Sequence, residues 1–239
     1  MSIIAAYIVP HPPLIVPEVG GGQEKKIQNT IDSYHRIARE IGELKPETVV
    51  VITPHSIMYQ DYIHVSPGSS ARGDLLKFGD NKTRIQVSYD SELVSLIEEL
   101  AAEEGISAGT LGERDKKLDH GTIVPLFFIG QYLQDHRVVR VSISGLSPRE
   151  HYRFGKCIKA AAERLSRRTV IVASGDLSHR LIEEGPYSFA EEGPAFDKLV
   201  TEAMAAGDFL TFMQFEEGFA EAAGECGLRS FIVMAGTLD

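Results

Sequence analysis

The sequence has few basic residues, few cysteines and no long apolar runs. It contains 24 lysines and arginines against 34 acids, a net charge of −10, whereas nucleic-acid binding needs clustered basic residues to neutralise phosphates. No apolar run approaches the ~20 residues that span a bilayer, and the first residues, MSIIAAYIVPHPP, lack the basic leader and cleavage site of a signal peptide. These absences argue against a nucleic-acid-binding protein and against a membrane protein.

Two cysteines, Cys157 and Cys226, are too few for a disulfide framework. We therefore expect a reducing, cytoplasmic location. Two common catalytic motifs are also missing. Gly20–Gly22 lacks the spacing of a phosphate-binding loop, and Ala173–Asp176 lacks the first glycine of a nucleophile elbow. Ser174 is thus only a minor candidate for a nucleophile.

The hydrophobic pattern alternates between strand-like and helix-like segments. Hydrophobic residues make up 43% of the 239 residues, which is enough for a sizeable core. Predicted strands cover 2–9, 48–53, 62–65, 83–87, 138–143 and 169–173, and predicted helices cover 23–44, 90–104, 122–133, 148–165, 194–206, 208–213 and 228–235. The alternation predicts one α/β domain over residues 1–239, with a mostly parallel central sheet and helices on both faces.

Three segments are expected to be irregular. The Gly/Ser-rich stretch 66–73 indicates a loop or ribbon over the sheet edge, and residues 181–194, rich in Glu, Gly and Pro, indicate a mobile loop. The last residues, 236–239, are typical of a turn that leads into a further strand. We therefore expect the native chain to continue past Asp239, into a further strand or a partner domain.

Four of the eight histidines lie where an apolar segment meets a tight polar turn. They are His11 in VPHPP, His55 in TPH, His120 in DHG and His179 in GDLSH. Ligands of open α/β sheets bind beyond the carboxyl ends of the strands, so these side chains can converge on one site. Converging imidazoles indicate a metal, proton transfer, or both. The other four, which we expect to be exposed, are His35, His64, His136 and His151.

The residue types suggest which side chains bind a metal and which transfer protons. His11 and His55 each follow a proline, and two neutral imidazoles suit Fe(II), Zn or Cu, with a carboxylate completing the facial triad of non-haem iron. Glu225, between Gly224 and Gly227, is the candidate carboxylate, although an acid near a helix N-terminus also stabilises the helix dipole. His120 and His179 lack the spacing of a helical metal pair and suit acid–base roles.

The ordered set of His11, His55, His120, His179 and Glu225 resembles the class III extradiol ring-cleavage dioxygenases, over residues 4 to 236. The chain is similar to the β-subunit of protocatechuate 4,5-dioxygenase, and the Memo proteins share this fold. The resemblance implies O₂-dependent cleavage of a catecholic ring, in a homo-oligomer or with a partner domain. It implies that His11, His55 and Glu225 bind Fe(II), that His179 takes a proton from the catechol, and that His120 acts on the bound oxygen.

The sequence also departs from this family. Cys226 follows Glu225 directly, and in the Memo branch the cysteine of a Cys-Gly pair is the metal ligand. A thiolate favours copper or zinc over a ferrous site, and in other relatives the counterpart of His179 helps to bind zinc. The alternative is therefore a Memo-like metal-binding protein that acts with a partner protein and cleaves no ring. No Arg/Lys-rich motif indicates a pocket for an aromatic carboxylate.

Overall fold

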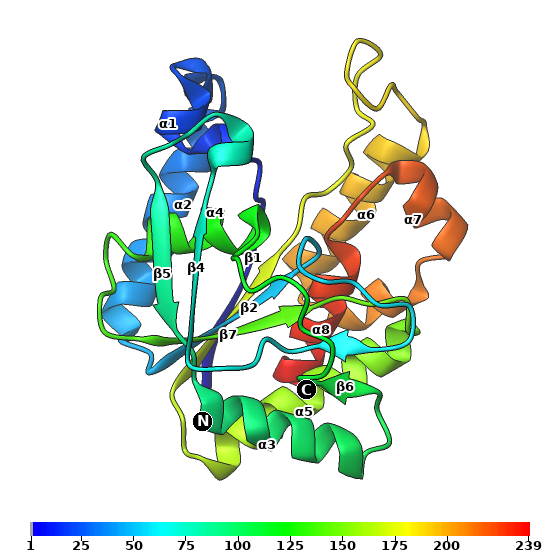
Figure 1. Ribbon diagram of the computed structural model, residues 1–239. Coiled ribbons are helices and arrows are strands. Elements are labelled where there is room, and N and C mark those ends of the chain that lie inside the picture. Colours follow the sequence, from blue (N-terminus) through cyan, green and yellow to red (C-terminus); the bar gives the residue numbers. More distant parts are fainter. Residues whose placement is uncertain (1) are drawn as a thin grey trace.

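A four-stranded parallel sheet forms the centre of the computed structural model, which describes residues 2–239 (Figure 1). The strand order is β1–β8–β2–β7. The bounds are Ile3–Val9 for β1, Thr48–Thr53 for β2, Arg137–Ser142 for β7 and Thr169–Ser174 for β8. Because every pair is parallel, all four carboxyl ends meet at one edge. The predicted α/β class is confirmed.

The two middle strands are buried along their whole length. They read TVVVIT in β2 and TVIVAS in β8, the continuous β-branched pattern of strands covered on both faces. Alternate residues of β2 contribute to different cores: Val50 and Ile52 belong to one, and Val49 and Val51 to the other. The sheet therefore separates two hydrophobic cores, one beneath each layer of helices.

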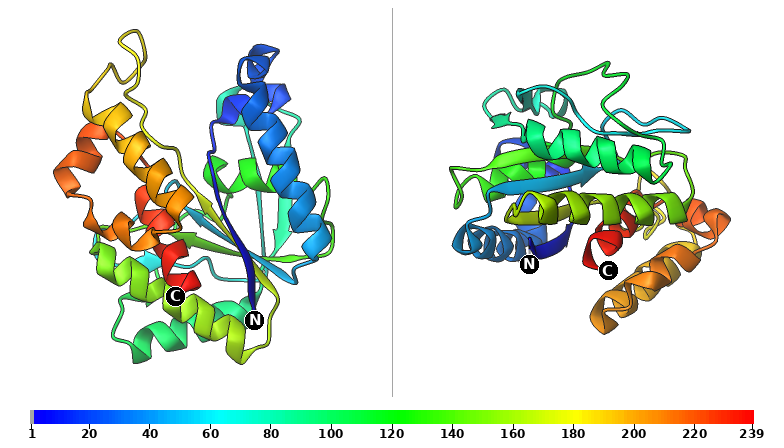
Figure 2. Two further views of the ribbon diagram at one scale, coloured as in Figure 1. Left: turned by 180° about the vertical axis from the view of Figure 1, so that it is seen from behind. Right: turned by 90° about the horizontal axis from the view of Figure 1, so that it is seen from below.

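Helices cover both faces of the sheet, as Figure 2 shows. On one face lie α2 (Gln28–Leu44) and α4 (His120–Ile129). The other face carries α3 (Ser91–Glu103), α5 (Pro148–Arg164), α6 (Glu192–Ala206), α7 (Glu217–Ala223) and α8 (Leu228–Leu238). Helix α2 buries Ile31, Tyr34, Ala38 and Ile41, the spacing of one apolar helix face. Over residues 2–239, no helix is both long and apolar enough to cross a membrane.

The remaining elements are short. A parallel pair joins β3 (Ile63–His64) to β6 (Ala108–Gly109), and an antiparallel ribbon joins β4 (Ser70–Asp74) to β5 (Arg84–Ser88). Helix α1 covers Pro17–Gly20. Four 3₁₀ helices complete the list: η1 (Pro13–Ile15), η2 (Gln23–Ile27), η3 (Leu76–Phe78) and η4 (Phe209–Gln214).

Several local predictions need correction. The ribbon expected near 66–73 is present, but its first strand already covers Ser70–Asp74 because it pairs with β5. The first turn of the helix predicted over 23–44 and the helix predicted over 208–213 are 3₁₀ helices. The turn predicted at 236–239 is wrong: α8 continues to Leu238, because Gly236 packs closely against α5 and Thr237 is buried.

Two histidines expected at the surface are fully buried, so that prediction is wrong for His64 and His151. The ring of His151 is satisfied inside the protein: its Nδ1 donates to the Ser147 carbonyl, and its Nε2 accepts from the Ser144 amide. His64 is covered because β3 lies against β7. Neither residue belongs to the site at the strand ends.

Candidate active site

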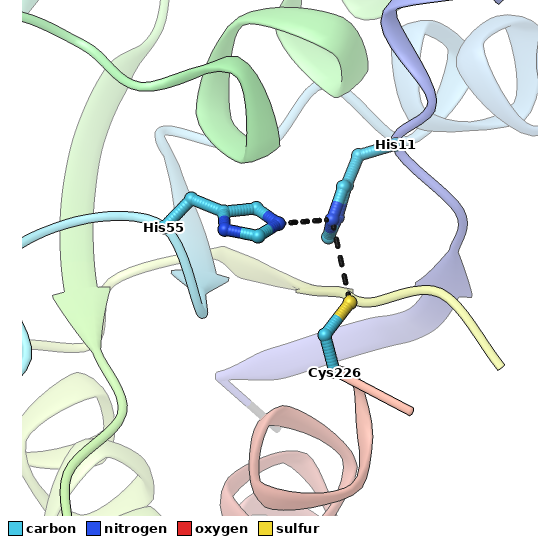
Figure 3. A group of neighbouring side chains, drawn as sticks. All are labelled: His11, His55 and Cys226. Carbon is cyan, nitrogen blue, oxygen red and sulfur yellow. Dashed lines mark hydrogen bonds between the residues drawn. The ribbon is translucent and has the colours of Figure 1, made fainter. Parts of the chain in front are cut away.

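His11 and His55 come together beyond the carboxyl ends of β1 and β2, as Figure 3 shows. Each follows a strand and one proline, Pro10 or Pro54, which keeps the preceding residue extended and ends the strand. Strand β8 lies between β1 and β2 in the sheet, so both side chains reach over its end. Their Nε2 atoms lie 2.9 Å apart.

The ring of His11 is held in one orientation by Ser174 at the end of β8. The Ser174 hydroxyl donates to the Gly121 carbonyl at 2.6 Å, and the same oxygen lies 2.9 Å from His11 Nδ1. Since the only hydroxyl proton is already used, Ser174 accepts from Nδ1–H. Nε2 of His11 is therefore unprotonated, and this kind of second partner is what metal-binding histidines use. Ser174 orients His11, and its hydroxyl is not free to act as a nucleophile.

Both histidines are kept neutral. Burial lowers the pKa of His11 to about 4, and burial also lowers the pKa of His55. Near pH 7 each ring therefore offers a nitrogen lone pair. A neutral imidazole is the form that binds a metal.

Cys226 brings a sulfur to the same place from the start of α8. Its Sγ lies 3.6 Å from His11 Nε2. Gly175 and Gly227 make this approach possible, because any side chain at Gly175 would collide with the Gly227 backbone. Burial raises the pKa of the Cys226 thiol to about 12, so a metal would have to displace its proton, as coordinated thiols require.

Glu225 faces elsewhere. Its carboxylate accepts from the Leu228 amide at 2.6 Å, and burial raises its pKa. The side-chain groups close enough to hold a metal include His11, His55 and Cys226 but not Glu225. The structure therefore does not bring Glu225 together with the two histidines, and its neighbour in sequence lies there instead.

His179 forms the second part of the cluster, with Asp176. Its Nδ1 donates to the Gly224 carbonyl at 2.6 Å, and its Nε2 lies 3.3 Å from the Asp176 carboxylate. The hydrogen bond with Asp176 raises the pKa of His179, so this ring accepts a proton more readily than His11. The ring of Tyr187 lies 5.1 Å from that of His179. Asp176, His179 and Cys226 form a second group with metal-binding spacing.

His120 is the first residue of α4 and lies against His55. The two rings are stacked with centroids 4.1 Å apart. Asp119 positions both residues: it caps α4 through the Thr122 amide and accepts from the Thr53 hydroxyl at 2.6 Å. Burial lowers the pKa of His120 to about 4. Near pH 7 it is therefore a neutral hydrogen-bonding group.

A cavity of about 470 Å³ opens beside this cluster and is lined by His55 and His120. Its size is within the range of small-molecule sites. Phe78 also lines this cavity, and its ring lies 5.1 Å from the His120 ring. A small aromatic molecule in this cavity would lie next to the histidine cluster.

The sequence pattern identified the four histidines but missed the residues that orient them. Asp176 accepts from the His11 amide at 2.7 Å and also bonds His179. Asp119 supports His55 and His120 as described above, and Ser174 orients His11. Their position in the sequence was the available signal: Ser174 ends β8 and Asp176 lies in the turn after it, at the sheet edge that holds the histidines.

The donor geometry fits a metal ion. Two nitrogens that bind one ion at about 2.0–2.1 Å are roughly 2.8–3.4 Å apart, and a nitrogen and a thiolate sulfur roughly 3.1–3.6 Å. The observed separations are 2.9 Å for His11 and His55 and 3.6 Å for His11 and Cys226. The unprotonated Nε2 of His11 provides a lone pair that no hydroxyl or amide of the protein uses.

Comparison with known proteins assigns this cluster to a family. The model of the catalytic LigB subunit of aromatic ring-opening dioxygenase matches residues 5–239. The chain belongs to this family. The LigB match covers β2, β7 and β8, strand β1 from Ala5 onward, and every histidine of the cluster.

Three known proteins are similar in sequence to this LigB-family chain. It is 40% identical to Protein CA_C1420 of Clostridium acetobutylicum, covering 100% of this chain and 53% of that protein. It is 26% identical to the 3,4-dihydroxyphenylacetate 2,3-dioxygenase of Escherichia coli, covering 98% of this chain and 89% of the relative. It is 28% identical to the 2-aminophenol 1,6-dioxygenase beta subunit of a Pseudomonas species, covering 92% and 81%.

The length of one relative and a similar solved structure complete the comparison. The chain spans about half the length of the Clostridium relative. An uncharacterized Escherichia coli K12 protein, JW3007, shares the fold with a TM-score of 0.59 and 20% identity, over 85% of this chain and 81% of that one. The family is thus established by sequence, and the fold by structure as well.

Proposed function

We propose that this protein is a metal-dependent extradiol-type dioxygenase that opens the ring of a small catecholic aromatic with O₂. The observation that carries the proposal is the paired Nε2 atoms of His11 and His55, 2.9 Å apart at the end of a cavity of about 470 Å³. A proton acceptor, His179, lies in the same cluster. Membership of a dioxygenase family supports the same assignment.

We propose His11, His55 and Cys226 as the metal-binding residues. Glu225, the ligand that the resemblance implies, would first have to release the Leu228 amide and turn toward the histidines. A bound ferrous ion would supply the redox chemistry that couples a catechol to O₂. The protein's part is to orient the donors and to manage protons.

His179 has the surroundings of a general base. Its Nδ1 proton is held by the Gly224 carbonyl, which leaves Nε2 to take a proton from a substrate hydroxyl. The Asp176 carboxylate, 3.3 Å from Nε2, stabilises the positive ring that results. An acceptor with a pKa near the working pH is the most effective general base.

His120 and Phe78 form the wall beside this centre. Because His120 is neutral and stacked on His55, it can donate one hydrogen bond to an oxygen at the centre without bringing a charge. The Phe78 ring packs edge to face against His120. Two aromatic rings in contact provide a surface on which the ring of a substrate can pack.

An anaerobic reconstitution tests the proposed function. The full chain is loaded with Fe(II), its iron content is measured, and O₂ uptake and product absorbance are followed against a panel of catechols. We expect O₂ uptake and a yellow ring-fission product with at least one catechol. Bound iron with neither signal across the panel contradicts the proposal.

A second candidate is a metal-binding protein that acts with a partner and cleaves no ring. The specific observation in its favour is the sulfur of Cys226, which lies 3.6 Å from His11 Nε2 where the dioxygenase pattern expects a carboxylate. Thiolate ligands favour zinc or copper. Tight zinc or copper binding together with no O₂ uptake by the iron-loaded protein would support this candidate over the first.

A further inference from the structure

The carboxylate of Asp176 lies between the two parts of the histidine cluster. Its Oδ1 accepts from the His11 amide at 2.7 Å, while its Oδ2 lies 3.3 Å from His179 Nε2 and 3.9 Å from His11 Nε2. The side chain is only 20% exposed, and no lysine or arginine nitrogen of residues 2–239 lies within 4.0 Å of the carboxylate. Because a buried carboxylate without a cation is unfavourable, Oδ2 needs a positive partner.

The ring of His179 presents a lone pair to the same oxygen. Its Nδ1 donates to the Gly224 carbonyl at 2.6 Å, since a carbonyl oxygen can only accept. When the ring is neutral, Nε2 therefore carries no proton and faces Asp176 Oδ2, 3.3 Å away. Two acceptors at this distance repel each other unless a positive charge lies between them. A proton can provide that charge, and so can a metal ion.

The spacing of this second group fits the ligands of one metal ion. A nitrogen and a carboxylate oxygen that both bind one zinc ion are roughly 2.9–3.5 Å apart, and His179 Nε2 and Asp176 Oδ2 are 3.3 Å apart. The donor atoms of Asp176, His179 and Cys226 all lie within 4.8 Å of one another. Cys226 is also a member of the group that contains His11 and His55.

The sulfur of Cys226 lies where two ions could share it. Sγ accepts from the Asp176 amide at 3.2 Å and lies 3.6 Å from His11 Nε2. A thiolate has more than one lone pair, so a single sulfur can bind two metal ions. Metal ions in two-metal enzyme sites are about 3.5–4 Å apart, which a shared sulfur allows.

We propose that Asp176, His179 and Cys226 form a second metal position, that this position takes zinc, and that zinc bound there inhibits the enzyme. One carboxylate, one imidazole and one thiolate are donors that zinc accepts. Zinc in this position occupies His179 Nε2, the atom proposed to take the substrate proton. The inhibition rests on the proposed function, whereas the metal position does not.

The two positions should fill in sequence. The first ion binds through His11, His55 and Cys226. Once the Cys226 sulfur is bound to that ion it is a weaker donor to a second one, and the two cations repel each other. Reconstitution with one equivalent of iron therefore fills the first position, and the second position fills only when free zinc is in excess.

Zinc stoichiometry tests the metal position on the full chain. Metal-free protein is dialysed against increasing free Zn(II), and bound zinc is measured by elemental analysis. We expect two zinc ions per chain in the wild type and one in Asp176→Asn and in His179→Gln. Asp197→Asn is the control and should bind two, because it removes a carboxylate that accepts from the Ser178 amide beside this turn but belongs to neither metal group.

Cobalt distinguishes a shared sulfur from a distant second site. One equivalent of Co(II) should give the electron paramagnetic resonance signal of an isolated ion. A second equivalent should weaken this signal, because a bridging thiolate couples the two spins. A signal that doubles, or a wild type that binds a single zinc ion, overturns the proposal. The wild-type measurements decide the question even if a variant fails to fold, which circular dichroism shows.

Inhibition is measured as O₂ uptake with a catechol, on iron-loaded protein whose iron content is followed throughout. Excess zinc should lower the rate of the wild type on the order of 10²-fold while the iron stays bound, because the general base is blocked. Asp176→Asn should lose less than about 2-fold of its own rate at the same zinc concentration, since it lacks one donor of the second position. Zinc that fills the second position without lowering O₂ uptake overturns the inhibition.

The outcomes separate this inference from the function beneath it. A single zinc ion per chain together with O₂ uptake by the iron-loaded protein overturns the second position and leaves ring cleavage intact. Two coupled ions together with no O₂ uptake support the second position and contradict ring cleavage.

Discussion

The Nε2 atoms of His11 and His55 lie 2.9 Å apart and face each other across the carboxyl ends of β1 and β2. With His11 Nδ1 bonded to Ser174, the His11 lone pair is aimed at His55. Two neutral imidazoles in this arrangement can provide two ligands of a metal site. The proposed metal site depends on this pair more than on any other contact.

Substitution of either histidine should abolish metal binding. We expect His11→Ala and His55→Ala to contain almost no metal after reconstitution, because each removes one of the three proposed protein ligands. His35→Ala, on α2 away from the cluster, is the matched control and should keep the wild-type metal content. Elemental analysis of the purified variants provides the measurement. Full metal content in either cluster variant would contradict the assignment.

Separate substitutions of Glu225 and Cys226 can show which of the two is the third metal ligand. Cys226→Ser should lower metal affinity, since its sulfur lies 3.6 Å from His11 Nε2. Glu225→Ala should retain the metal but lower the free energy of unfolding by about 1 kcal/mol, because the Leu228 amide at the start of α8 loses its acceptor. Competition with a chelator and urea unfolding measure the two effects. Loss of metal from Glu225→Ala alone would assign the ligand to the carboxylate.

His179 should be needed for turnover and not for metal binding. We expect His179→Ala to keep the metal and lose on the order of 10²–10⁴-fold in kcat, the usual contribution of a general base. Asp176→Asn removes the hydrogen bond that raises the pKa of His179. The acid limb of its kcat/KM profile should therefore move to lower pH. Equal metal loss from His11→Ala and His179→Ala would make His179 a ligand instead.

Acid should destabilise the fold through His151, which is buried away from the proposed metal site. Burial lowers the pKa of His151 from 6.5 to about 4. Between these values the unfolded chain binds a proton that the folded chain excludes, so stability falls as the pH drops through this range. In His151→Gln, urea unfolding should show a smaller loss of stability on acidification than in the wild type. Arg149→Gln on the same helix is the control, and identical slopes in all three proteins would contradict the explanation.

Much of the fold follows from local sequence. The runs TVVVIT and TVIVAS are typical of buried strands. A parallel sheet brings the carboxyl ends of such strands to one edge. Because His11 follows strand β1 and His55 follows strand β2, the same rule allowed these two histidines to be paired from the sequence. The sequence indicated a loop or ribbon near 66–73, but the bounds of strand β4 could not be predicted, because SARGD is not strand-like by itself and is stabilised by pairing with β5.

The third ligand could not be predicted for a different reason. Glu225 and Cys226 are adjacent in one turn, and which of them faces His11 depends on the close contact of Gly175 with Gly227. That contact joins segments about 50 residues apart. A contact of this kind leaves no pattern within one stretch of sequence.

Ring cleavage with isotopically labelled O₂ tests the central claim most directly. The iron-loaded protein is mixed with a catechol under labelled O₂, and the product is analysed by mass spectrometry, with the zinc-loaded protein as a redox-inactive control. The proposed function predicts a ring-opened product that carries both atoms of the labelled O₂, formed only with iron. Intact catechol, or a product without the label, from protein with its iron demonstrably bound would contradict it.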